Sequence, residues 1–532
     1  MNDKSKRGTS TKYEARSTQT RATGKKSAGS NFVLLASNLA VLCLLLQAEA
    51  FSQAGTLAGF DAYVAKAVQD WRTPGLAIAV VKDGQVVFTK GYGVRELGKP
   101  QPADTHTLFA IGSTTKAMTA ALVGMLVDEK KLGWDDPVVK HLPWFQVKDP
   151  YLTREITVRD LLTHRAGLGN VDFLWYGQTT STREVLERVR LLEPSYSLRS
   201  SFIYQNVMYA AAGAVIEAAS GKPWNEMLRS RIFEPLGMKE SIATAATLSQ
   251  QPNVARPHAL VDGTLRAIEN VSVDAVAPAG AVWSSVHDMS KWMQMLLDNG
   301  KAGTRVLLQP ETVQQLFTPQ TMVTREEFYP TARLTKPHWT TYGLGWFQQD
   351  YRGRALDYHT GSIDGMVAIH GLIRDERLGV YVLANRDHTE LRHALVLNVV
   401  DRFTGGGDRD WSAELLTLYG DLQAEADAKR KAEEGKRVAG TSPTLPLARY
   451  AGTYSDPLHG DALVKLDAGR LRVRYGSALD GPLEHWNYDT FRAKWDAEWR
   501  GTALVTFQLD EHGEPTVLEA LGARFIRLPA AK

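Results

Sequence analysis

Hydrophobic residues follow two different spacings along this chain, and these spacings predict strands in some stretches and helices in others. Residues 76–81 and 85–89 are almost wholly apolar, and an Asp-Gly pair at 83–84 separates them, so they predict a β-hairpin. Residues 117–127 are apolar on every face of a helix, which predicts a helix buried inside the protein rather than lying on its surface.

The middle of the chain is predicted to be helical, and strands return towards residue 400. The helical patterns cover 156–164, 184–192, 207–219, 289–297 and 391–403. The later strand patterns cover 342–347, 367–373 and 378–383. Strands at both ends with helices between them predict an α/β (α+β) fold, with one mostly antiparallel sheet flanked by helices and an all-helical subdomain.

A glycine triplet at 405–407 marks the end of this main domain, which we place at 53–404. A charged, alanine-rich stretch follows and predicts an exposed helix in a linker that we place at 405–445. From residue 446 to 532 short alternating runs return, which predict a small all-β domain, either a barrel or a sandwich.

The first residues of the chain, 1–50, have the pattern of an export signal. A basic lead precedes an apolar run at 32–46, and the small-x-small sequence Ala48-Glu49-Ala50 follows it. The run has about fifteen residues, fewer than the roughly twenty that span a bilayer. We therefore expect a periplasmic or secreted protein that meets a membrane only through this segment. An uncleaved anchor in the inner membrane stays open.

Charge and cysteine content exclude several classes of function. The formal net charge is +3, but residues 1–50 carry eight Lys or Arg against three acidic residues, so the remainder is slightly acidic and gives no sign of nucleic-acid binding. The only cysteine, Cys43, lies in the leader, so cleavage would leave no thiol for disulfides, catalysis or metal binding. No phosphate-binding glycine loop and no metal-spaced histidine motif is present, so we expect no cofactor and no metal.

The start of the buried helix carries candidate chemistry. Ser113 lies three residues before Lys116, so both side chains share one helical face. Burial and the positive helix N-terminus both lower the pKa of a lysine, and the neutral amine that results can activate a serine hydroxyl. The alternative is structural: Ser113, Thr114 and Thr115 cap the helix, and the lysine reaches solvent.

A second polar stretch, Tyr204-Gln205-Asn206, directly precedes the apolar residues 207–219. Asn206 is a common helix cap, which is the structural alternative for this residue. In the functional interpretation Tyr204 relays protons with Lys116, and the amide of Asn206 holds a substrate carbonyl.

A third stretch, His359-Thr360-Gly361-Ser362, lies between two predicted strands. The small Gly361 lets a substrate backbone approach closely. Backbone N–H groups at this point, together with the N–H of Ser113, would form an oxyanion hole. His359 by itself is also compatible with an ordinary turn histidine.

Taken together in this order, the three stretches resemble the active-site elements of the serine β-lactamase and penicillin-binding protein superfamily. The similarity is greatest to its class C β-lactamase-like branch, which includes D-aminopeptidases, DD-peptidases and carboxylesterases. Residues 161–168, 233–238 and 342–346 also fit that branch. The stretch Tyr450-Ala451-Gly452-Thr453-Tyr454 is similar to a lipocalin-like β domain that follows some of these hydrolases.

The resemblance implies an exported serine hydrolase that needs no metal or cofactor. Ser113 would be acylated by a small-molecule amide, ester or peptide, and water would then release the acyl group. Lys116 and Tyr204 would share the general-base and general-acid work, while Asn206 orients the acyl amide. The N–H groups of Ser113 and Ser362 would form the oxyanion hole.

One position departs from the pattern of the family. Many β-lactamases carry a lysine where this chain has His359, and a histidine is mostly neutral at pH 7. With Thr360 and Gly361, this residue would contact substrate, so a weaker grip on β-lactam carboxylates favours amide, peptide or ester substrates. A true β-lactamase and a non-catalytic penicillin-binding or scaffold protein stay open as alternatives, as does a homo-oligomer.

Overall fold

The computed structural model describes residues 55–407 and 409–529, so the export signal predicted at 1–50 lies outside the described residues. Within the described ranges, no helix has both the length and the apolar character needed to cross a membrane. From Leu57 onward the described chain forms one compact unit.

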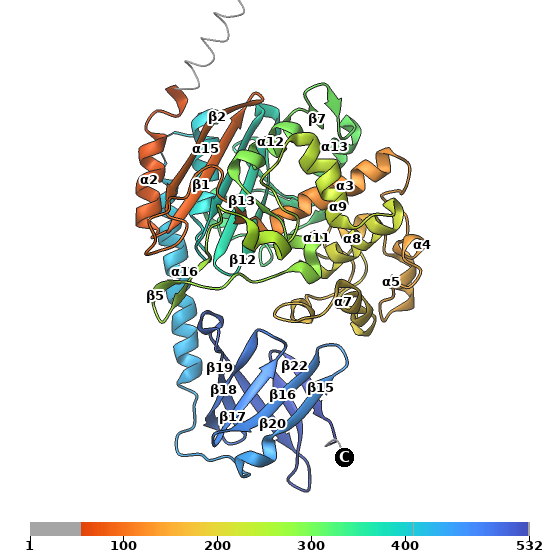
Figure 1. Cartoon of the computed structure of the whole chain (residues 1–532), viewed down its shortest axis with the longest axis vertical. Coiled ribbons are helices and arrows are strands. Elements are labelled where there is room, and N and C mark those ends of the chain that lie inside the picture. Colours follow the sequence, from red (N-terminus) through yellow and green to blue (C-terminus); the bar gives the residue numbers. More distant parts are fainter. Residues whose placement is uncertain (1–54, 408, 530–532) are drawn as a thin grey trace, which may run out of the picture. The chain divides into compact units, whose positions relative to one another are not determined.

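The main domain is built on an eight-stranded antiparallel sheet with the order β2-β1-β14-β13-β12-β11-β10-β9 (Figure 1). Its strands are β1 (Gly75–Lys82), β2 (Gln85–Gly93), β9 (Thr321–Met322), β10 (Thr340–Tyr342), β11 (Phe347–Tyr351), β12 (Arg354–Ile363), β13 (Met366–Ile373) and β14 (Leu378–Ala384). The early strand β1 pairs with the late strand β14, with Ile78 opposite Val382. This pairing confirms a sheet assembled from both ends of the domain.

Helices cover both faces of this sheet, which explains why β1 is apolar at every position from Leu76 to Val81. Leu76, Ile78 and Val80 pack into one core with helices α2 (Phe60–Asp70) and α15 (Leu391–Thr404). The intervening residues, Ala77, Ala79 and Val81, pack into a second core on the other face. The helices of that second core include α3 (Thr115–Asp128), α8 (Asn206–Ser220) and α12 (Val286–Leu297). A strand buried on both faces reads as a continuous hydrophobic run.

Between β2 and β9 the chain is mainly helical, as predicted. The remaining helices here are α4 (Val138–His141), α5 (Pro150–Glu155), α6 (Val158–Leu161), α7 (Thr182–Arg188), α9 (Trp224–Leu228), α10 (Glu234–Leu236), α11 (Ala277–Gly280) and α13 (Pro310–Phe317), and α14 (Ala332–Thr335) follows β9. Three short ribbons accompany them: β3 (Phe109–Ala110) with β6 (Trp283–Ser284), β4 (His258–Val261) with β5 (Thr264–Ala267), and β7 (Lys301–Ala302) with β8 (Arg305–Val306). The predicted helix at 156–164 is thus only the four residues of α6.

The single strand predicted at 342–347 is wrong, because residues 343–346 form the turn between β10 and β11. Gly345 has a left-handed φ of +87°, and a Cβ atom there would lie 3.0 Å from backbone atoms of Lys116 and Ala117. The turn therefore packs directly on the first turn of α3, a contact that only glycine allows.

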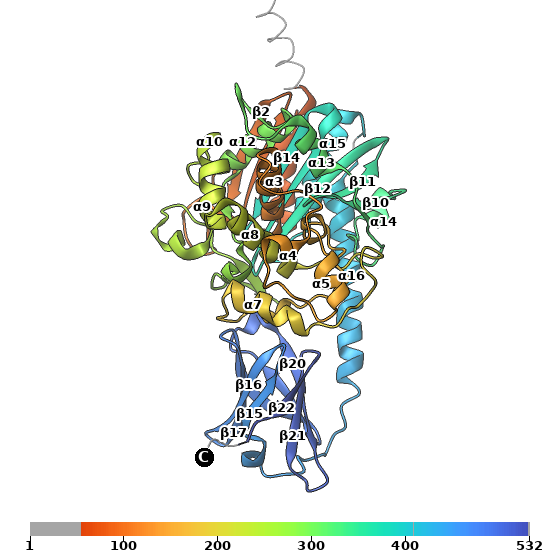
Figure 2. The same cartoon turned by 90° about the vertical axis from the view of Figure 1, so that its right-hand side faces the viewer.

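Helix α16 (Trp411–Glu434) precedes a closed barrel of eight antiparallel strands (Figure 2). These are β15 (Gly452–Asp456), β16 (Gly460–Asp467), β17 (Arg470–Tyr475), β18 (Leu479–Asn487), β19 (Thr490–Lys494), β20 (Thr502–Leu509), β21 (Pro515–Ala520) and β22 (Ala523–Arg527). The last strand pairs with the first, with Tyr454 opposite Arg527, so the domain is a barrel and not a sandwich. Its interior is filled by aliphatic and aromatic side chains, and the rings of Tyr450 and Phe507 lie 5.0 Å apart.

Candidate active site

The nucleophile candidate Ser113 lies in a short 3₁₀ turn, Gly112–Thr114, between β3 and α3. Gly112 enters this turn with a φ of +50°, and a Cβ atom on it would lie 2.6 Å from the backbone nitrogen of Ser362 in β12. Glycine is therefore required both for the backbone conformation and for the close approach. Ser113 itself is half-buried at this junction.

The hydroxyl groups of this turn do not cap α3, so that structural expectation is wrong. Thr114 stands at the N-cap and makes no capping hydrogen bond. Its hydroxyl instead donates to the Ile111 carbonyl at 2.8 Å and lies 2.6 Å from the Tyr381 hydroxyl. The Ser113 hydroxyl is consequently left for another partner.

That partner is Lys116, which is completely buried and so does not reach solvent as the structural alternative required. Its Nζ lies 3.0 Å from Ser113 Oγ, and it donates to Asn206 Oδ1 at 2.7 Å and to the Ala279 carbonyl at 2.9 Å. The last two atoms can only accept, so they fix two N–H bonds of the amine. In the neutral amine the lone pair is then left to face Ser113.

Burial lowers the pKa of Lys116 well below its ordinary value, and the charge of Asp172 opposes this shift only in part. None of the three hydrogen-bond partners of the amine carries a charge. A buried ammonium without a contacting carboxylate is costly, so the environment favours the neutral base.

Asn206 is the first residue of α8, and the N-cap before it, Gln205, makes no side-chain capping bond. The Asn206 amide bridges the amine and a carboxylate: Oδ1 accepts from Lys116, and Nδ2 donates to both carboxylate oxygens of Asp172 at 3.1 Å. The carboxylate therefore decides which way the amide points. Sequence analysis missed Asp172, which lies in a 3₁₀ turn (Asp172–Leu174) without any local pattern to mark it.

Tyr204 lies on the other side of the amine, with its ring centroid 4.8 Å from Lys116 Nζ. Desolvation raises the pKa of this phenol well above 10, although a hydrogen bond with Ser113 lowers it in part, so the phenol keeps its proton near neutral pH. The buried His164 supports it, with the two rings 4.3 Å apart and His164 Nδ1 accepting the Gln205 N–H at 3.0 Å. Lys116, Ser113 and Tyr204 therefore form one contiguous cluster.

His359 lies within β12, so it is not the turn histidine of the structural alternative. It is buried, and both ring nitrogens are partnered: Nε2 lies 3.0 Å from the Tyr342 hydroxyl, and Nδ1 lies 2.6 Å from the Thr360 carbonyl. Burial, and secondarily the charge of Lys116, lowers its pKa to about 3. The ring is therefore neutral and offers no fixed cation to a ligand.

The backbone of β12 contacts the 3₁₀ turn Gly112–Thr114 that carries Ser113. A Cβ atom on Gly361 would lie 1.9 Å from the Ile111 carbonyl oxygen and 3.0 Å from the Ser113 nitrogen. The buried Arg392 holds this part of β12 in place: its Nη1 donates to the Gly361 carbonyl at 2.6 Å and to Ser362 Oγ at 3.0 Å. No sequence pattern pointed to this arginine. The backbones that bear the Ser113 and Ser362 N–H groups thus lie side by side, as an oxyanion hole requires.

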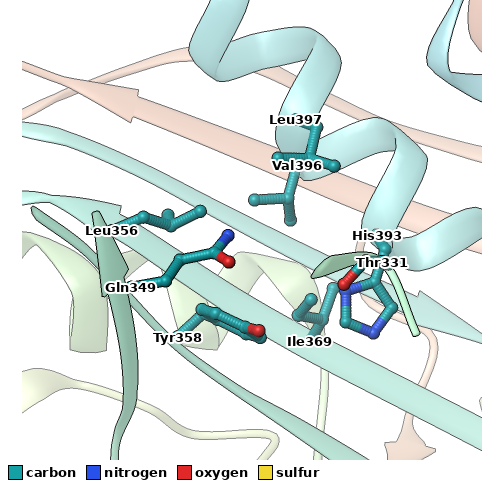
Figure 3. Close-up of a pocket in the computed structure, with 8 residues that line it drawn as sticks. All are labelled: Thr331, Gln349, Leu356, Tyr358, Ile369, His393, Val396 and Leu397. Atoms are coloured by element: carbon teal, nitrogen blue, oxygen red, sulfur yellow. The ribbon is translucent and has the colours of Figure 1, made fainter. Parts of the chain in front are cut away.

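A small cavity lies elsewhere, between the sheet and α15 (Figure 3). Its lining residues are Thr331, Gln349, Leu356, Tyr358, Ile369, His393, Val396 and Leu397. Its volume of about 10 Å³ holds at most one water molecule, and no residue of the predicted site lines it. It is therefore not a substrate site.

This fold and site define a protein of the β-lactamase type, and comparison with known sequences agrees. The model of the β-lactamase family matches residues 60–400, and a domain of unknown function (DUF3471) matches 436–524. The chain therefore belongs to the β-lactamase family, as its three motifs indicated.

Known relatives include the unguisins hydrolase ungD of Aspergillus violaceofuscus, which is 30% identical over 82% of each chain. Protein flp of Staphylococcus aureus strain MW2 is 23% identical over 61% of this chain and 62% of its own. Together they support assignment to the serine hydrolases of this family.

Two solved structures share the fold. The octameric penicillin-binding protein homologue from Pyrococcus abyssi has a TM-score of 0.58 and 22% identity, covering 88% of this chain and 100% of its own. SurE has a TM-score of 0.53 and 24% identity, covering 90% and 100%.

Proposed function

We propose that this protein is a serine hydrolase that forms an acyl-enzyme on Ser113 and hydrolyses small amides or esters, including peptides. The observation that carries this proposal is the fully buried amine of Lys116, 3.0 Å from the Ser113 hydroxyl and without a contacting carboxylate. A neutral amine in that place can take the hydroxyl proton as the oxygen attacks a carbonyl carbon.

Each remaining step has a group in position. As the Ser113 oxygen bonds to the carbonyl carbon, negative charge develops on the carbonyl oxygen, and the N–H groups of Ser113 and Ser362 stabilise it. Tyr204 keeps its proton at neutral pH because its pKa is raised, so it acts as the acid that protonates the leaving amine or alcohol. Lys116 passes the proton that it took from Ser113 to the Tyr204 phenolate, so both groups regain their starting states. A water molecule then attacks the acyl carbon while Lys116 takes its proton, and that proton goes to Ser113 Oγ as the acyl group leaves.

The neutral state of His359 favours amides and esters over β-lactams as substrates. A lysine at this position would supply a permanent positive charge for a drug carboxylate, and the buried, neutral imidazole does not. A relative is named an unguisins hydrolase, which supports hydrolysis as the reaction. We further propose that residues 1–50 export the protein, and that its partners are small-molecule substrates rather than nucleic acid.

The test is a labelling and turnover experiment on the purified protein. A fluorophosphonate should add covalently to Ser113, seen by mass spectrometry of the modified peptide, and the Ser113→Ala variant should stay unlabelled. A panel of short p-nitrophenyl esters, D-alanine p-nitroanilide and nitrocefin should show turnover of the first two well above that of the third. Absence of both labelling and turnover would instead favour the non-catalytic scaffold alternative.

A further inference from the structure

The side chains of His106, Glu240 and His287 come together at the surface of the main domain, outside the site described above. Their ligand atoms all lie within 4.8 Å of one another, and in the described ranges no other group of His, Cys, Asp and Glu side chains meets this condition. Nothing in the proposed hydrolysis uses them. We propose that these three side chains bind one divalent transition-metal ion of the Zn²⁺ type.

The donor set favours this class of ion. Two imidazoles and one carboxylate suit Zn²⁺ and its neighbours, whereas Ca²⁺ and Mg²⁺ prefer oxygen ligands alone. Ligand atoms around a tetrahedral Zn²⁺ lie about 3.4 Å apart, given bonds of about 2.1 Å. The observed separations run from 2.6 Å between His106 and Glu240 up to 4.8 Å, so side-chain rotations would be needed to bring the three ligand atoms to this spacing.

The backbone of each ligand residue is already held in place. The His106 N–H donates to Asp104 Oδ1 at 2.9 Å, and the His287 N–H donates to the Thr105 carbonyl at 3.0 Å. The first bond is local, and the second ties the segment before β3 to the start of α12. A site whose ligands are fixed in advance loses little entropy when the ion binds.

Glu240 is held by the same helix start. Its backbone N–H donates to Asp288 Oδ2 at 2.9 Å, and its side-chain Oε2 accepts a hydrogen bond from the Ser285 hydroxyl. A hydrogen-bonded ligating carboxylate is typical of metal sites, because outer partners orient it. The nearby cation, Lys291, forms an ion pair with Asp288 at 2.9 Å, so it does not occupy the Glu240 carboxylate that would bind the metal ion.

The two histidine rings lie next to each other, and His106 contacts this carboxylate. His106 Nδ1 and Glu240 Oε1 are 2.6 Å apart, and the rings of His106 and His287 have centroids 4.6 Å apart. A metal ion would replace the bond between His106 and Glu240, and any proton in it would leave to solvent.

The side chain of His106 is 53% exposed and that of Glu240 30% exposed, so water can occupy a fourth position on the ion. The ion would join the segment before β3 to the start of α12, which follows β6. Because β3 and β6 pair with each other, metal binding should stabilise the strand pair that leads into the Ser113 turn. This role is structural and does not depend on the proposed hydrolysis.

The test is a titration of the purified, chelator-treated protein with ZnCl₂ by calorimetry, and with CoCl₂ by visible absorption. About one equivalent of Zn²⁺ should bind, the midpoint of thermal unfolding should rise, and Co²⁺ should give the intense bands of a tetrahedral complex. His106→Gln and His287→Gln should each weaken binding at least about tenfold. His338→Gln is the matched control, since it removes an exposed histidine 2.8 Å from the carboxylate of Asp350, and it should bind as the wild type does.

Two results would overturn the proposal: no Zn²⁺ binding and no Co²⁺ bands in the wild type, or equal affinity in the two histidine variants. If a variant does not fold, as seen by circular dichroism, the wild-type Co²⁺ spectrum alone decides. Ester turnover should be the same before and after chelation. Loss of turnover on chelation, restored by Zn²⁺, would contradict the structural role, and failure of hydrolysis in all samples would leave the metal titration unaffected.

Discussion

Two helices of the main domain start in similar surroundings, yet their serines do different work. Helix α3 follows β3, and α12 follows β6, the strand that pairs with β3. At the start of α12, Ser285 has an extended backbone, and its hydroxyl accepts the Asp288 N–H at 3.2 Å as a regular N-cap. At the start of α3, Ser113 lies inside a 3₁₀ turn, and its hydroxyl caps nothing. The backbone conformation thus decides whether a serine completes a helix or is left to react.

The residue three positions after each serine extends the contrast. Asp288 is buried, but it is an anion at a helix N-terminus and forms an ion pair with Lys291 at 2.9 Å. Lys116 is equally buried, but it is a potential cation at a helix N-terminus and contacts only neutral groups. In the first arrangement the negative charge of Asp288 has a cationic partner. In the second, burial without such a partner keeps the amine of Lys116 neutral. Perturbed groups of the second kind are characteristic of functional sites.

The largest expected effect is that of Ser113→Ala. Turnover of a p-nitrophenyl ester should fall at least about 10³-fold, because the attacking oxygen is gone. The midpoint of thermal unfolding should barely change, since this hydroxyl caps no helix. If the variant still turns over substrate, Ser113 is not the nucleophile. If it unfolds at a much lower temperature, Ser113 stabilises the fold as Ser285 does.

Lys116→Met should lower kcat about 10²- to 10⁴-fold by removing the base. It should lower the free energy of unfolding in urea by no more than about 1–3 kcal/mol, because the loss of the amine leaves Asn206 Oδ1 and the Ala279 carbonyl without a donor but removes the cost of burying the amine. A much larger loss of stability would mean that the amine of Lys116 is retained to stabilise the folded protein rather than for catalysis.

The same variant tests the sign of a pH effect on stability. Between its lowered folded pKa and the ordinary lysine value of about 10.4, Lys116 binds more protons in the unfolded chain than in the native protein. The stability of the wild type relative to Lys116→Met should therefore rise as the pH rises through this window. A difference that stays flat would show that the amine is charged in the native state.

Ser285→Ala should act in the opposite way to Ser113→Ala. Loss of the cap should destabilise the protein by about 1 kcal/mol in chemical unfolding. Ester turnover at a temperature well below the unfolding transition should remain close to that of the wild type. A large loss of turnover would place this serine in the catalytic machinery instead.

The smallest effect is expected for Asp172→Asn. The negative charge of Asp172 raises the pKa of Lys116 against the effect of burial, so its removal should move the acid limb of the pH profile of kcat/KM to lower pH. The test is this profile measured on one ester for both proteins. If the acid limb of the profile does not move, Asp172 has no influence on the pKa of Lys116, even if kcat/KM itself changes.

Much of the fold was predictable from continuous apolar runs. Residues 76–81 and 117–127 became a strand and a helix buried on all sides, because such runs are stable only when covered on both faces. The errors came from contacts between distant segments. The apolar pattern at 342–347 contains a glycine turn that packs on α3. The hydroxyl residues before α3 do not cap it, because the chain enters this helix through a 3₁₀ turn.

The sequence by itself determined the fold class and the three motifs. It also determined the shortest-range contact among them, because one helical turn brings Ser113 and Lys116 to the same face. Tertiary structure decided the chemical state of these groups. Asn206, 90 residues away, takes one N–H of the lysine, Asp172 orients that amide, and burial holds His359 neutral. Spacing along a chain sets which side chains share a face, whereas burial and partners from distant segments set their charge, and charge determines whether they can react.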